Sequence, residues 1–79
     1  MHLDDILSLA PNQSDREELL NLSKQYYDLG RSGTAPDSMS RQNEVLDLIM
    51  ARFERYVRAA RFPIPSRHEV GQMIMKHFE

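Results

Sequence analysis

The segment of the chain that comes nearest to metal chemistry is the run His68-Glu69-Val70-Gly71-Gln72. Its start matches the helical zinc motif H-E-x-x-H, in which two histidines one turn apart share the metal and the glutamate acts as a base. Gln72 stands where the second histidine is needed, and no further ligand is well spaced in a chain without cysteine. We therefore expect no metal site, and we expect His68 to face solvent near the start of a helix.

The other candidates for catalysis have simpler explanations. The serines occupy positions typical of helix caps and loops, and none lies in the G-x-S-x-G turn of a nucleophile. The carboxylate pairs Asp4-Asp5 and Glu17-Glu18 stand in predicted first turns, where negative charge favours the helix dipole. The three glycines form no phosphate-binding loop, and a chain of 79 residues is small for a water-excluding pocket. We predict no catalytic residues and no cofactor.

A set of arginines recurs at every third position of one long helical segment: Arg52, Arg55, Arg58 and Arg61. On a helical wheel they wind around the side opposite the apolar arc. Glu54 can pair with Arg58 one turn later, whereas the other three have no acid three or four residues away within the helix. Leu48 also lies outside the apolar arc, beside Arg52 and Arg55. An apolar side chain rimmed by arginines is typical of an interface anchor.

Two interpretations of this arginine surface stay open. Residues 1–40 carry seven acids and three bases, a net charge of −4, whereas residues 41–79 carry five acids and seven bases, a net charge of +2. The arginines could therefore form a solvated face that balances the acidic helices of the same molecule. Alternatively, they form a surface that binds another protein.

Apolar spacing predicts a short first helix and a longer second one. Leu3, Ile6, Leu7 and Ala10 follow the helical repeat before Pro11-Asn12 ends it. Residues 14–17 (Ser-Asp-Arg-Glu) fit a capping box, which predicts that the second helix begins at Ser14, and Gly30 is placed to end it as a left-handed cap. Of Tyr26 and Tyr27, which point about 100° apart on a helix, one is expected in the core.

Residues 30–38 are rich in turn-forming types and predict a loop between the second and third helices. The third helix should begin at Ser38 or Ser40 and reach Phe62, before Pro63-Ile64-Pro65 stops it. A second capping box at residues 66–69 opens a last helix. Its core face contains Val70, Met73, Ile74 and Phe78, and Met75 falls off that face, so we expect Met75 to be exposed.

These elements predict one all-α domain over residues 1–79, a small bundle of about four helices whose second and third helices form an antiparallel pair. Without disulfides or zinc, stability must come from helix packing or from association, and a homodimer is one of the expected states. No apolar stretch is long enough to span a membrane, and the first residues do not resemble a secretory signal. We expect a cytoplasmic protein.

Two functions follow as hypotheses. The first is a protein-binding regulator or adaptor, which docks through Leu48 and the arginine surface, or through the exposed side of the last helix with Met75. Small inhibitors and accessory factors of phages and plasmids are similar in size and composition. The second is DNA binding in a helix-turn-helix-like manner, in which the last helix presents residues suited to phosphates and base edges: Arg67, His68, Gln72 and Lys76. The isoelectric point of about 5.9 favours the first.

Overall fold

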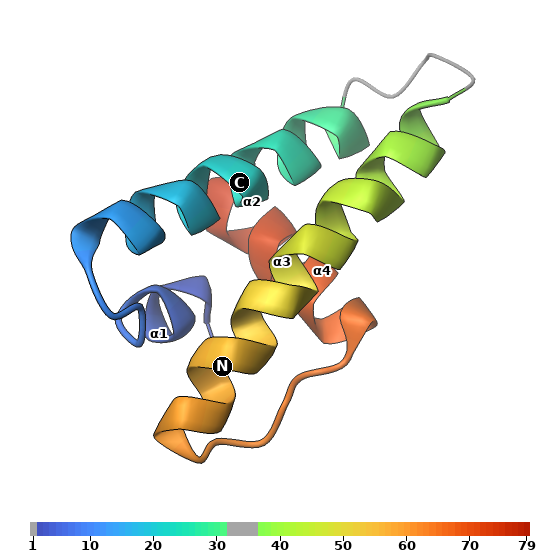
Figure 1. Ribbon diagram of the computed structural model, residues 1–79. Coiled ribbons are helices and arrows are strands. Elements are labelled where there is room, and N and C mark those ends of the chain that lie inside the picture. Colours follow the sequence, from blue (N-terminus) through green and yellow to red (C-terminus); the bar gives the residue numbers. More distant parts are fainter. Residues whose placement is uncertain (1, 32–36) are drawn as a thin grey trace.

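The computed structural model describes residues 2–31 and 37–79. These residues form four helices and no strand: α1 (Leu3–Leu7), α2 (Gln13–Arg31), α3 (Ser38–Ala60) and α4 (Arg67–Phe78). Helices α2 and α3 lie side by side and antiparallel, α4 crosses them, and α1 packs at the end where α2 begins (Figure 1). The predicted all-α bundle and its antiparallel pair are thus confirmed.

The start of α2 differs from the prediction, because the cap lies two residues earlier in the chain than Ser14. The helix begins at Gln13, and the backbone N–H of Asp15 donates to the side-chain oxygen of Asn12 at 2.8 Å. Asn12 therefore caps the helix, and Ser14 lies exposed within the first turn. The predicted cap at Ser14 is wrong because asparagine is an equally good cap, and the earlier start adds backbone hydrogen bonds to the helix.

The end of α2 also differs. The helix continues through Gly30 to Arg31, and Gly30 does not have the positive φ that a left-handed cap requires. A Cβ on Gly30 would lie 2.7 Å from Nε2 of Gln42, and this amide donates to the carbonyl oxygen of Tyr26 at 3.3 Å. The glycine thus allows a side chain of α3 to approach the backbone of α2. Residues 32–36 of the predicted loop lie outside the described residues.

The connection from α3 to α4 is closer to expectation. The last helical residue of α3 is Ala60, two residues before the predicted end, and Arg61 adopts a left-handed conformation with φ of 62°. The N–H of Phe62 donates to the carbonyl of Val57 at 3.0 Å, which satisfies a free carbonyl of the last turn. Ser66 caps α4 as predicted, because its hydroxyl accepts the N–H of Glu69 at 3.2 Å.

The core lies between α3 and the other three helices. On α3 the buried side chains follow the predicted arc: Leu46, Ile49, Phe53, Tyr56 and Val57. They pack with buried residues of α1, α2 and α4, among them Leu3, Leu19 and Ile74. Tyr27 is buried and Tyr26 is partly buried, so one of the two tyrosines is in the core as expected. Among the described helices, none combines the length and apolar character that a membrane crossing requires.

Candidate functional site

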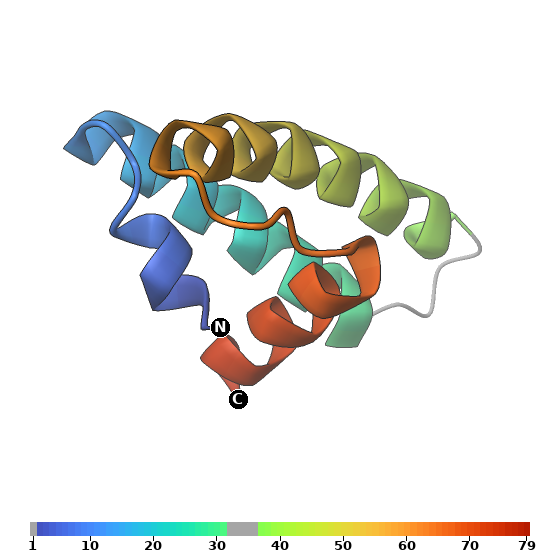
Figure 2. The ribbon, with the colours of Figure 1, turned by 90° about the horizontal axis from the view of Figure 1, so that it is seen from below.

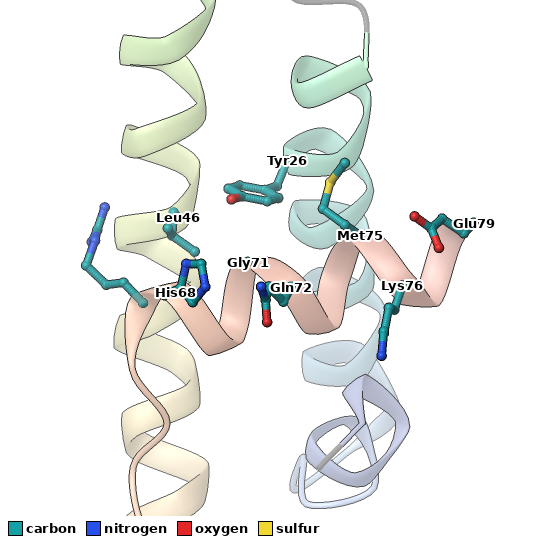
Figure 3. A pocket seen from close by; sticks show the side chains of 9 residues that line it. Tyr26, Leu46, His68, Gly71, Gln72, Met75, Lys76 and Glu79 are labelled. Carbon is teal, nitrogen blue, oxygen red and sulfur yellow. The ribbon is translucent and has the colours of Figure 1, made fainter.

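An open groove runs along one side of α4, where this helix crosses α2 and α3. Tyr26 of α2 and Leu46 of α3 form part of its wall, and α4 supplies the remainder (Figure 3). The α4 residues that line it include the four that were predicted to contact nucleic acid: Arg67, His68, Gln72 and Lys76. His68 is exposed, as predicted. We call this feature the α4 groove.

The shape of the α4 groove depends on a contact between Tyr26 and Gly71. Gly71 is buried, and a Cβ built on it would lie only 2.7 Å from the hydroxyl oxygen of Tyr26. A helix interior disfavours glycine, so its use at this position has a structural reason. The missing side chain lets the tyrosine ring lie against α4 and form the apolar wall of the groove.

Met75 is not exposed as the sequence predicted. It is partly buried, packs against the core and lies about 3.5 Å from the Cβ position of Gly30. The prediction is wrong because α4 crosses under the C-terminal part of α2, so that α2 covers a side of α4 outside its main apolar face. Met75 consequently lines the α4 groove beside Tyr26 instead of standing free on the surface (Figure 3).

Charges of both signs surround the α4 groove. Arg67 at one end forms an ion pair with Asp47 of α3. Lys76 and Glu79, which carry charges of opposite sign, both line the other end. Nearby, Arg31 donates a hydrogen bond to the hydroxyl of Tyr27 at 2.9 Å, and this bond raises the pKa of Arg31 above its usual value. Arg67 and Lys76 at the groove are thus accompanied by the acids Asp47 and Glu79, so that the positive and negative charges are equal in number.

The arginine surface of α3 is only partly available. Leu48 is 57% exposed, as predicted. Arg52, however, pairs with Glu18 of α2 at 2.5 Å, and Arg58 pairs with Glu54 at 2.5 Å. The expectation that Arg52 lacks an acid was limited to its own helix, and α2 supplies one from alongside.

Two of the four arginines are thus paired within the molecule, and of these only Arg52 is paired with an acid of another helix. Arg55 and Arg61 are exposed, and they form no ion pair with the other described residues. The structure places these arginines and Leu48 on α3, whereas Met75 belongs to the α4 groove. The sequence offered these as alternative docking surfaces, and they lie in two separate places on the molecule.

Sequence reasoning missed Tyr26 and Leu46 as walls of the groove, because only tertiary packing brings α2 and α3 to α4. Gly71 was the available signal: a glycine inside an otherwise regular helix often marks a close approach of another group. Within the described part of the chain, no three histidine, aspartate or glutamate side chains are grouped so that they could hold a metal ion. Comparisons with protein-family models, with curated proteins and with solved structures find no match to this chain.

Proposed function

We propose that the protein is a non-catalytic regulator or adaptor that binds a segment of a partner protein in the α4 groove. The observation that carries this proposal is the composition of the groove, in which the partly buried Tyr26 and Met75 lie beside exposed polar side chains of α4. Apolar area next to a polar rim is typical of protein interfaces. The partner segment would insert an apolar side chain beside Tyr26 and Met75 and place an acid near Lys76.

Charge favours a protein partner over nucleic acid. Binding to a phosphate backbone depends on cations that are free to replace counterions. Arg67 is paired with Asp47, Lys76 shares its end of the groove with Glu79, and the isoelectric point of the chain is about 5.9. The side chains suited to DNA are thus gathered on one face of α4, but the charge of Arg67 is compensated by Asp47 and the chain as a whole is acidic.

The experiment is an affinity pull-down from lysate of the source cells, with and without nuclease, using three forms of the protein. Lys76→Glu reverses a charge on the rim of the α4 groove, and Lys24→Glu makes the same change on an exposed position of α2. We expect a stoichiometric partner protein that survives nuclease, is lost with Lys76→Glu and is retained with Lys24→Glu. Equal capture by all three forms would contradict the assignment of the groove.

DNA binding by α4 remains the second candidate, supported by the gathering of Arg67, His68, Gln72 and Lys76 along the groove. The same pull-down distinguishes it. Recovery of nucleic acid that is lost at moderate salt, with no partner protein, would favour DNA binding, because phosphate contacts weaken steeply as salt rises. Lys76→Glu would then weaken binding to all DNA sequences alike, since it removes a phosphate contact.

A further inference from the structure

The outward face of α3 carries a stripe of four residues: Glu44, Leu48, Ala51 and Arg55. All four are exposed, and Leu48 is among the most exposed large apolar side chains described, at 57%. Their spacing of four, three and four residues is that of a coiled-coil seam, which keeps side chains on one side of a helix. The stripe lies opposite the buried arc of α3, so it faces away from the rest of the molecule.

The positions of these four residues are symmetric about the midpoint between Ile49 and Met50. An antiparallel copy of α3, related by a two-fold axis at that point, would place Leu48 against the small Ala51 of the second copy. It would also place Glu44 against Arg55 of the second copy. Both contacts occur twice, as a two-fold interface requires.

A parallel arrangement lacks this complementarity. It would bring Glu44 against Glu44 and Arg55 against Arg55, and like charges in register oppose association. The order acid, leucine, alanine, base is therefore complementary to a second copy of α3, and only when that copy runs antiparallel to the first.

We propose that this stripe binds a second copy of the chain, forming an antiparallel homodimer through α3. Two apolar Leu48–Ala51 contacts form its centre, and two Glu44–Arg55 ion pairs flank them. The small side chain of Ala51 allows the helices to approach closely, which gives Leu48 a site to fill.

The remaining charges of α3 are compatible with this pairing. Arg41 of one copy would lie near the level of Arg58 of the other, at the ends of the overlap. Arg58 is already paired with Glu54, and Arg52 at the edge of the stripe is paired with Glu18. These internal ion pairs reduce the repulsion that a row of arginines would otherwise create.

The homodimer does not use the α4 groove. In Figure 2, α3 runs along one side of the molecule and α4 lies on the opposite side. Both grooves stay open in the dimer, so that one particle presents two copies of the candidate binding site. The inference is thus independent of the proposed function and is tested on the purified chain alone.

The test is sedimentation equilibrium over a range of concentrations, with charge reversals at each side of the proposed ion pair. Glu44→Arg and Arg55→Glu should each raise the dissociation constant of the dimer about tenfold or more, because each places like charges together. The double variant, which exchanges the two charges, should return it to within about threefold of the unaltered chain, since the pair is re-formed in the opposite sense. Leu48→Asp should leave only monomer.

Asp28→Arg and Lys24→Glu are the matched controls, because they change the net charge equally at exposed positions of α2. Circular dichroism checks that every variant keeps its helix content. We expect the controls to dimerise like the unaltered chain. A chain that stays monomeric at all concentrations, a double variant as weak as the single variants, or controls that weaken the dimer equally would each overturn the inference.

Discussion

Tyr26 lies against α4 at Gly71, where the absence of a side chain makes room for the tyrosine hydroxyl. Alanine in place of Gly71 would favour the helix by up to about 1 kcal/mol. Its Cβ would, however, lie 2.7 Å from the tyrosine hydroxyl, and the next ring atom would be at an ordinary 3.5 Å. The clash therefore involves a single oxygen atom.

This geometry predicts that the effect of Gly71→Ala on the free energy of unfolding changes sign when the tyrosine hydroxyl is removed. We expect Gly71→Ala to lower the free energy of unfolding by about 1 kcal/mol in the unaltered chain, since relieving an overpacked contact costs more than the helix gains. In a Tyr26→Phe background, the same substitution should raise it by about 0.5–1 kcal/mol. Urea denaturation of the four proteins measures the coupling. A destabilisation that is equal in both backgrounds would show that the hydroxyl is not the obstacle.

Which side chains of α3 are buried was predictable, because the spacing of apolar residues along this single helix determines it. Ile49 and Phe53 are fully buried and their neighbour Leu48 is exposed, as the helical wheel predicts. The partner of Arg52 and the position of Met75 were not predictable, because both depend on α2, which is distant in sequence and adjacent in space. A wheel describes one helix and contains no information about its neighbours.

At the scale of the element, the helix starts provide a direct comparison between a cap that is used and one that is not. Ser66 accepts the N–H of Glu69, whereas Ser14 has the same sequence context but lies inside α2 behind Asn12. Ser66→Ala and Asn12→Ala should each cost about 1 kcal/mol of stability. Ser14→Ala should cost close to nothing. Thermal unfolding measures all three, and a loss for Ser14→Ala as large as that for Asn12→Ala would contradict the observed start of α2.

The end of α3 offers a substitution that should stabilise the protein. Arg61 has a φ of 62°, and residues with a Cβ are strained in this left-handed region by about 1–2 kcal/mol. Arg61→Gly should therefore raise the free energy of unfolding by about 0.5–1 kcal/mol, because glycine adopts this conformation without strain. Ala59→Gly, two residues earlier and inside the helix, should lower it by about 1 kcal/mol. Parallel denaturation curves for the two variants provide the test, and a loss of stability in both would argue against the left-handed cap.

Helix number and approximate bounds were predictable because proline, serine and apolar spacing act locally. The errors at both ends of α2 have one cause, which is that two local signals competed. Asn12 and Ser14 are both good caps, and Gly30 could either end a helix or admit a neighbouring side chain. The contact with Gln42 of α3 decides the second case.

For the whole molecule, the α4 groove was only half predictable. Its polar side is a local property of α4, and the four residues proposed for nucleic acid do line it. Its apolar wall arises where α4 crosses the antiparallel pair, which no local pattern describes. The packing also alters the charge available along the groove, because Asp47 of α3 forms an ion pair with Arg67.

The central claim, that a partner protein occupies the α4 groove, is tested most directly by photo-crosslinking in cells. A photoreactive residue replaces either Gln72, which lines the groove, or Asn21, which is exposed on α2. We predict a nuclease-resistant adduct with one protein from position 72 and none from position 21. Equal adducts from both positions, or an adduct with nucleic acid from position 72, would contradict the claim.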